Sequence, residues 1–181
     1  SDFKNSIIIN TVIPVLIFLG GIGFAAILNI YQYFLKKDKR LTTTTRIAIK
    51  MSIFLIIFGT IIIFILEYSN NKTLGTLPFF EKIGAAFFQS VTTRTAGFNT
   101  ISIAELREPT VFLFVVLMFI GASPGSTGGG IKTTTFGILI FYALGVLKRR
   151  EYVEVFKRRI DWELINKALA IVVISVFYII V

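Results

Sequence analysis

Four long apolar segments constrain the fold of this chain more than any other feature of its sequence. They cover residues 6–35, 51–66, 110–147 and 164–181. A helix that crosses a lipid bilayer needs about 20 mostly apolar residues, and the four segments reach or approach that length. Hydrophobic residues make up 55% of the chain and charged residues 16%, whereas a soluble domain has about 45–50% and about 25%. The sequence therefore predicts an all-α membrane protein, and we expect both ends to be interior positions of a longer chain.

The residue inventory excludes several kinds of chemistry. The chain has no cysteine, which excludes disulfides and thiolate metal sites. It also has no histidine, which removes the usual general base of hydrolytic enzymes and the commonest metal ligand. Hydrolysis of the Ser-His-Asp kind is therefore excluded, and we expect no covalently bound cofactor.

Basic residues are concentrated in two loops, and their placement predicts the sidedness of the protein. They outnumber acidic residues at 36–50 and again at 148–163, whereas residues 67–110 carry four basic and four acidic side chains. Loops rich in lysine and arginine stay in the cytoplasm. The pattern predicts a multi-pass protein of the cell membrane rather than a nucleic-acid-binding protein. Residues 36–50 and 148–163 are then cytoplasmic and residues 67–110 external.

A fifth apolar segment, residues 77–91 (LPFFEKIGAAFFQSV), is too short to cross the membrane and carries Glu81 and Lys82. The path between the two cytoplasmic loops must cross the bilayer an even number of times. The segments at 51–66 and 110–147 supply those crossings. We therefore expect residues 77–91 to form a re-entrant helix that enters the membrane from outside and returns to the same side.

The segment at residues 110–147 is too long for one straight crossing, because a continuous helix would be about 57 Å long against about 30 Å of hydrocarbon. Two crossings would place the basic loop at 148–163 outside, against its charge. One crossing with a break fits both constraints, and the break falls at GASPGSTGGGIKTTT, residues 121–135. Non-helical backbone at this depth occurs only where it is buried in protein or lines a water-filled cavity.

The stretch VTTRTAGFNT, residues 91–100, follows the predicted re-entrant helix and suits an ion filter. In such a filter, carbonyl oxygens of the backbone replace the hydration shell of the ion. Glycine permits backbone dihedrals that other residues avoid, and threonine can add a hydroxyl oxygen at the inner end. The residues leave a second interpretation open, a polar turn that closes an interfacial helix.

Three interpretations fit the glycine-rich break. The first is a phosphate-binding loop, because Gly125 and Gly130 have the spacing of that motif, although Ile131 precedes Lys132 and no strand comes before. The second is a structural kink for close helix packing, which does not explain a lysine at membrane depth. The third is a gate, a flexible segment beneath the filter that blocks the pore and moves aside. Its predicted residues are Gly121, Gly125, Ser126, Thr127, Gly128, Gly129, Gly130 and Lys132.

TTRTAGFNT followed by GASPGSTGGGIKTTT closely resembles the KtrB/TrkH family of potassium-translocating subunits, and LIFLGGIGF at residues 16–24 resembles the end helix of that family's second repeat. The resemblance implies M1–P–M2 pore-loop repeats, four of which surround one pore. It assigns residues 1–40 to the last helix of repeat two, 41–150 to repeat three and 151–181 to the truncated first helix of repeat four. Within repeat three it implies M1 at 45–68, a pore helix at 77–91, a filter at 92–100 and a broken M2 at 109–147.

The resemblance also implies a function and partners. Potassium is the expected transported ion, with sodium as an alternative co-ion. The implied filter residues are Thr95, Ala96, Gly97 and Phe98, and the backbone carbonyls of the first three would hold K⁺. Arg94 is expected to point away from the pore, because its charge would repel the ion. Members of the family work as homodimers in the lipid bilayer and bind a cytosolic nucleotide-binding regulatory ring.

One departure from the family concerns the filter. A single filter strand is present, whereas a pore needs strands on all sides, so the remaining repeats of the same pore would be required for conduction. Two alternatives stay open, a non-conducting membrane scaffold or truncated remnant, and a nucleotide-dependent membrane enzyme that uses the glycine-rich loop. Potassium uptake would exclude the first, and nucleotide binding would favour the second.

Overall fold

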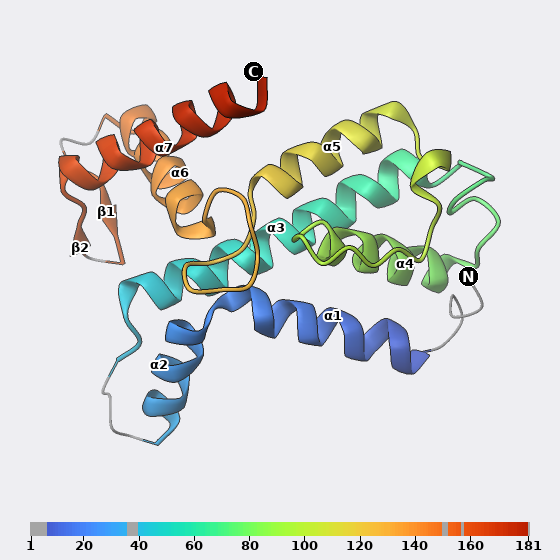
Figure 1. Ribbon diagram of the computed structural model, residues 1–181, viewed down its shortest axis with the longest axis horizontal. Coiled ribbons are helices and arrows are strands. Elements are labelled where there is room, and N and C mark those ends of the chain that lie inside the picture. The colour runs from blue at the N-terminus through green and yellow to red at the C-terminus, as the bar shows by residue number, and fades with distance from the viewer. Residues whose placement is uncertain (1–6, 36–39, 150–151, 157, 181) are drawn as a thin grey trace.

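The computed structural model describes residues 7–35, 40–149, 152–156 and 158–180, which form seven α-helices, one short 3-10 helix (Ile103–Glu105) and one small β-hairpin. Figure 1 shows a long central helix, α3, with α5 on one side and α1 and α4 on the other. The predicted all-α fold is confirmed. Residues 1–6, 36–39, 150, 151, 157 and 181 lie outside the described residues. The predictions made for them, which belong to the two terminal segments and the two basic loops, are therefore not compared with the structure.

Helix α3 (Thr43–Glu67) begins at a capping residue, because the Thr42 hydroxyl accepts the Thr45 N–H at 3.2 Å. Its 25 residues span about 38 Å, which is enough to cross a bilayer. The sequence predicts this helix at residues 45–68. Among the described residues, α3 and α7 (Trp162–Ile180) are the two helices long and apolar enough to cross on their own.

The first apolar segment is sharply bent, a feature that the sequence analysis does not predict. The segment forms α1 (Ile7–Ile22) and α2 (Phe24–Phe34), which meet at 95°. Gly23 makes the bend with a φ of 91°, a conformation that glycine adopts at little cost. The first N–H group of a helix has no partner within the helix, and that of Phe24 bonds to the Gly125 carbonyl at 3.0 Å. The glycine-rich stretch between α5 and α6 (α5 and α6 are described below) therefore contacts this bend.

The apolar segment at residues 110–147 forms two helices, α5 (Glu108–Phe119) and α6 (Thr133–Leu147), with an irregular stretch at residues 120–132 between them. The helices have 12 and 15 residues, or about 18 and 22 Å. Neither length crosses the hydrocarbon core alone. A single crossing therefore needs both helices and the stretch between them.

The buried core lies where α3, α4 (Phe79–Thr92) and α5 meet. Its apolar members are Leu55, Ile63, Leu74, Ala86, Ile101, Leu113, Phe114, Leu117 and Ile120. Because this core includes residues of α4 and of the chain after it, burial holds the re-entrant region against α3. Large apolar side chains on outer faces stay exposed, among them Phe112 at 71% and Phe177 at 69%, as expected for surfaces that face lipid.

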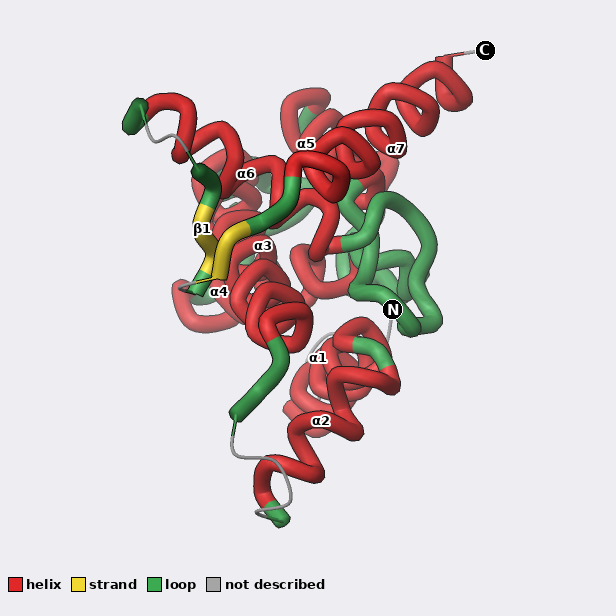
Figure 2. Tube along the Cα trace, turned by 90° about the vertical axis from the view of Figure 1, so that its left-hand side faces the viewer, coloured by secondary structure: helices red, strands yellow, loops and turns green. Residues whose placement is uncertain are grey.

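A β-hairpin in the basic loop before α7 is not predicted by the sequence. Strands β1 (Glu154–Val155) and β2 (Arg158–Arg159) pair antiparallel, as Figure 2 shows in yellow. Strands of two residues are too short to show an alternating pattern. Phe156 in the turn joins the hairpin to α3, because Lys50 Nζ lies 4.6 Å from the centroid of its ring. The two basic loops therefore meet at one end of the molecule.

Candidate functional site

The re-entrant region begins with α4, which starts directly after Pro78. Its 14 residues span about 21 Å, too little to cross the hydrocarbon core. The helix lies close against α3, where Ser90 Oγ donates a hydrogen bond to the Ile56 carbonyl at 2.8 Å. Gly59 permits this approach, because a Cβ at that position would collide with Ser90 Oγ. Two small residues therefore set how deeply α4 lies against α3.

The segment after α4, residues 93–100, is here called the return segment. Thr92 still belongs to α4, and residues 93–96 form a turn. Backbone that is neither helix nor turn, as an extended filter strand requires, is therefore limited to the second half of the segment. Thr95 has φ 63° and Gly97 has φ 76°. Glycine takes this left-handed conformation freely, whereas threonine, branched at Cβ, is strained there. The turn therefore holds one residue against its own preference.

Side chains of α4 hold the return segment in place. Thr92 Oγ1 accepts the Phe98 N–H at 3.0 Å and donates to the Phe98 carbonyl. The buried amide of Gln89, in the orientation that satisfies both of its ends, accepts the N–H groups of Thr100 and Ile101 at 3.2 and 3.1 Å. These bonds satisfy backbone groups that would be costly to leave unpaired away from water.

Arg94 lies in the same turn and reaches α3. Its guanidinium donates to the hydroxyl and to the carbonyl of Ser52. These two bonds direct the charged end of Arg94 at α3, and the residue also borders the cavity described below, beside Thr95.

Residues 120–132, here called the glycine-rich segment, are held largely by backbone contacts. The Ile131 N–H bonds to the Phe119 carbonyl at 2.9 Å, so the chain returns to the point at which it left α5. Gly121 is needed for this path, because a Cβ there would collide with the carbonyl oxygen of Gly129. The result is a compact double turn between α5 and α6 (Figure 1, gold).

Lys132 folds back over the glycine-rich segment, where its Nζ donates to the Gly128 carbonyl at 2.8 Å. Gly128 in turn lies next to the return segment. A Cβ on Gly128 would be 3.0 Å from Thr95 Oγ1 and 2.5 Å from Ala122 Cβ. The absence of a side chain at this position therefore lets the predicted gate approach the predicted filter.

The glycine-rich segment also docks on α1, a contact that sequence reasoning missed. The Ser123 N–H bonds to the Gly21 carbonyl at 2.9 Å. A Cβ on Gly20 would be 3.6 Å from Thr127 Oγ1, an ordinary contact. The signal was available, since three glycines within residues 20–23 mark a place where backbones can approach closely.

A cavity of about 260 Å³ joins these parts of the molecule. It is bordered by the end of α1, by the return segment and by the glycine-rich segment. The predicted site residues that line it are Thr95, Ala96, Phe98, Thr127 and Gly128. Arg94 lines it as well, although its guanidinium is bonded to Ser52. The other predicted residues do not line it, namely Gly97, Gly121, Gly125, Ser126, Gly129, Gly130 and Lys132.

A buried carboxylate organises the opposite end of α3. Glu67, the last residue of this helix, is fully buried. It accepts hydrogen bonds from the hydroxyls of Thr110 and Thr73 at 2.5 and 2.6 Å, from Asn70 Nδ2 at 2.6 Å and from the Arg107 N–H at 2.9 Å. The carboxylate therefore ties the end of α3 to the start of α5.

The fold and the cavity define a class of protein, a helical membrane protein in which a re-entrant helix and a broken helix border one cavity. The family model for TrkH, described as a cation transport protein, matches residues 1–181. The chain belongs to this TrkH cation transport family. Its members are transporters and not enzymes, and the resemblance drawn from the two sequence motifs is confirmed.

Several relatives are similar over most of the chain. The Ktr system potassium uptake protein B of Bacillus subtilis is 38% identical over 93% of the chain, and that of Vibrio alginolyticus is 35% identical over 96%. The potassium/sodium uptake protein NtpJ of Enterococcus hirae is 35% identical over 88%. The chain spans 38%, 38% and 35% of the lengths of these relatives.

A solved structure supports the same fold. The potassium transporter TrkH from Vibrio parahaemolyticus matches 92% of this chain with a TM-score of 0.72, at 21% sequence identity. The match covers 36% of that transporter's chain. At this identity the likeness shows the fold alone.

Proposed function

We propose that this chain forms part of the pore of a Trk/Ktr-type potassium uptake system in the cell membrane. The observation that carries the proposal is the cavity shared by the two segments that the sequence singles out as filter and gate. Relatives named as potassium uptake proteins support potassium as the substrate. A relative named as a potassium/sodium uptake protein supports sodium as an alternative co-ion.

In the proposed filter, the backbone carbonyls of Thr95, Ala96 and Gly97 replace the water shell of K⁺, with Phe98 completing the segment. Thr95 and Gly97 both have left-handed dihedrals, on either side of Ala96. Dihedrals of this kind direct the carbonyls differently from those of a regular strand or helix, which supports a segment whose carbonyls face an ion. The bonds from Thr92 and Gln89 keep the segment in one conformation. The remaining repeats of the same pore supply the other sides of the ion site.

In the proposed gate, the glycine-rich segment lies next to the filter and blocks the passage until it moves. Its position beside Thr95 supports this role. The segment is held to α1 and α5 by backbone hydrogen bonds and closed by one lysine contact. Glycines lower the cost of changing backbone conformation.

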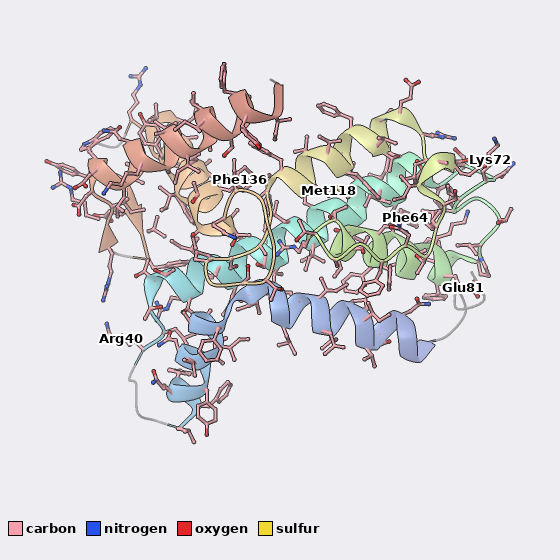
Figure 3. The ribbon with its side chains drawn as sticks, in the orientation of Figure 1. Arg40, Phe64, Lys72, Glu81, Met118 and Phe136 are labelled. Atoms are coloured by element: carbon pink, nitrogen blue, oxygen red, sulfur yellow. The ribbon has the colours of Figure 1, made fainter. Side chains whose placement is uncertain are left out.

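The proposed topology has residues 36–50 and 148–163 in the cytoplasm and residues 67–110 outside. The contact of Lys50 with Phe156 supports a common side for the two basic loops. Figure 3 places Arg40 at one end of the molecule and Lys72 and Glu81 at the other. The family resemblance extends the proposal to a homodimer in the bilayer that binds a cytosolic nucleotide-binding ring.

The proposal is tested in the full-length protein, expressed in cells that lack their own potassium uptake. Growth at low potassium is expected for the unaltered protein. Deletion of residues 125–130 should raise potassium flux when the regulator is inactive, because the passage is no longer blocked. Gly97→Ser should lower the preference for potassium over sodium. Normal expression with unchanged regulation would refute the gate, and unchanged selectivity would refute the filter.

The two alternatives make different predictions. A non-conducting scaffold would not restore growth at low potassium. A nucleotide-dependent function of the glycine-rich segment lacks its structural context, because helix α5 and not a strand precedes the segment. Lys132 also bonds to a carbonyl of its own loop. Titration of the purified protein with ATP is expected to show no binding that depends on Lys132.

A further inference from the structure

Arg94 is a buried cation in the turn that leads into the proposed filter. Only 6% of its surface is exposed. Its guanidinium bonds twice to one residue of α3, from Nη1 to Ser52 Oγ at 3.0 Å and from Nη2 to the Ser52 carbonyl at 3.1 Å. Ser52 is itself fully buried. Within the described part of the chain, no acidic side chain forms an ion pair with Arg94.

Packing alone does not explain an arginine at this position. A buried charge is unfavourable unless it is paired or hydrogen-bonded, and an apolar side chain of similar volume is often the more stable choice. The guanidinium holds its N–H groups in a fixed fork that can reach two acceptors at once, which a lysine ammonium does not reproduce. The hydroxyl and carbonyl of Ser52 form a matching pair of acceptors. The contact with Ser52 therefore fixes the orientation of the Arg94 side chain as well as burying it.

The residue that follows Arg94 is the strained one. Thr95 has φ 63°, and a conformation of this kind persists only where the surroundings hold it. The Arg94 carbonyl accepts the Thr95 hydroxyl at 2.7 Å, and the Arg94 N–H bonds to the Val91 carbonyl at 3.2 Å. The backbone of Arg94 is thus fixed on both sides, and its side chain ties that backbone to α3.

One face of α3 contacts both α4 and the turn that follows it. Ser52, Ile56 and Gly59 are spaced by four and three residues, which puts them on the same face of the helix. Ile56 and Gly59 receive Ser90 of α4, and Ser52 receives Arg94. Helix α3 therefore aligns the pore helix at one level and the start of the filter one turn away.

We propose that Arg94 is a positioning residue for cation selectivity. Through its two bonds to Ser52 it holds the peptide between Arg94 and Thr95, and so fixes the direction of the carbonyls that face the ion. Its role is exerted through the backbone and not by contact with the ion. This inference rests on the proposed function of the return segment as a filter.

The test measures uptake of potassium and of sodium by the full-length protein in cells that lack their own potassium uptake, with protein amounts matched by blotting. Arg94→Gln should lower the potassium-over-sodium ratio about tenfold, because a hydrogen bond to a charged group contributes on that scale. Ser52→Ala keeps the charge and removes one acceptor, so it should lower the ratio less. The double variant should be no worse than Arg94→Gln, because both changes break the same contact.

Two further variants separate positioning from a general structural role. Arg94→Lys keeps the charge but loses the fork, and its ratio should lie between those of the unaltered protein and Arg94→Gln. Ser69→Ala removes an exposed hydroxyl that accepts from Arg107 at 3.2 Å, away from this contact, and should leave the ratio unchanged. If Arg94→Gln does not reach the membrane, Ser52→Ala carries the test.

The outcomes distinguish this inference from the proposal on which it rests. If Gly97→Ser changes selectivity while Ser52→Ala and Arg94→Gln leave it unchanged, the filter stands and the positioning role is wrong. If the effects of Ser52→Ala and Arg94→Gln simply add, the two residues do not act through one contact and the inference also fails. If Gly97→Ser has no effect on selectivity, the filter assignment itself is wrong.

Discussion

The return segment and the glycine-rich segment are both non-helical and border the same cavity, but different contacts hold them. Buried side chains from the return segment and α4 fix the first, namely Arg94, Thr92 and Gln89. The second is held mainly by its own backbone, by carbonyls at the end of α1 and α5, and by Lys132. Its buried side-chain bond joins the hydroxyls of Ser123 and Thr133 at 2.8 Å, at the end of the segment where α6 begins. Most of its residues from Gly125 onward are exposed or half-buried.

This difference matches the two tasks that we propose. A filter must keep its carbonyls at one spacing, so side-chain bonds to rigid helices are of use there. A gate must change its conformation, and a segment with few buried side-chain contacts opens locally at low free energy. Changes in the first segment should therefore alter selectivity or stability, and changes in the second should alter regulation.

The largest expected effect is at Glu67, whose hydrogen bonds fix the end of α3 against the start of α5. Glu67→Gln replaces a buried carboxylate that accepts four hydrogen bonds by an amide that is a poorer acceptor. We expect the free energy of unfolding to fall by about 3 kcal/mol, measured by thermal unfolding in detergent. The matched control is Glu81→Gln, which alters an exposed carboxyl in the first turn of α4. Equal melting temperatures for the two variants would show that the buried cluster does not stabilise the fold.

The next effect concerns the depth of α4 against α3. Gly59→Ala places a Cβ against Ser90 Oγ and 3.0 Å from a methyl group of Leu117, so α4 must shift. We expect a loss of about 2 kcal/mol of stability, as for other overpacked sites, together with lower potassium selectivity. Gly84→Ala, on α4 with no atom within 4 Å of the new Cβ, should gain about 0.5–1 kcal/mol. A stable Gly59→Ala variant with unaltered selectivity would contradict the role of this contact.

The central helix, the re-entrant helix and the break in the next one follow from the sequence because they depend on local properties. Apolar length locates α3, charge placement excludes a full crossing at residues 77–91, and the glycines locate the break between α5 and α6. Each of these inferences uses residues that are close together in the chain. The family resemblance, carried by two short motifs, adds the order of the elements.

Features that depend on distant partners could not be predicted in the same way. Gly23 bends the first helix because the carbonyl of Gly125 lies in position to accept the Phe24 N–H, and no pattern within the first segment requires that partner. Likewise, nothing in the sequence links Arg94 to Ser52. The left-handed conformation of Thr95 could not be predicted from the sequence either, because β-branched residues rarely adopt it.

A matched pair of glycines sharpens the comparison at a smaller scale. Gly97 and Gly125 have φ of 76° and 70°, and a Cβ on either would meet no atom within 4 Å. Alanine at each position should therefore cost a similar amount of stability, about 1 kcal/mol. Gly97→Ala should change the potassium-over-sodium ratio and leave regulation intact. Gly125→Ala should change the flux with the regulator inactive and leave the ratio intact, and the reverse assignment in uptake assays would overturn the comparison.

The smallest expected effect on stability is at Lys132. Lys132→Met keeps much of the side-chain length but removes the bond from Nζ to the Gly128 carbonyl, and the half-buried position limits the cost to about 0.5–1 kcal/mol. Because this bond closes the glycine-rich segment on itself, its loss should raise the flux measured with the regulator inactive, while selectivity stays unchanged. Lys132→Arg, which retains a donor and the charge, should restore most of the regulation. If Lys132→Met lowered selectivity and left the inactive flux unchanged, the lysine would act on the filter, and the separation between a fixed segment and a movable one would not hold.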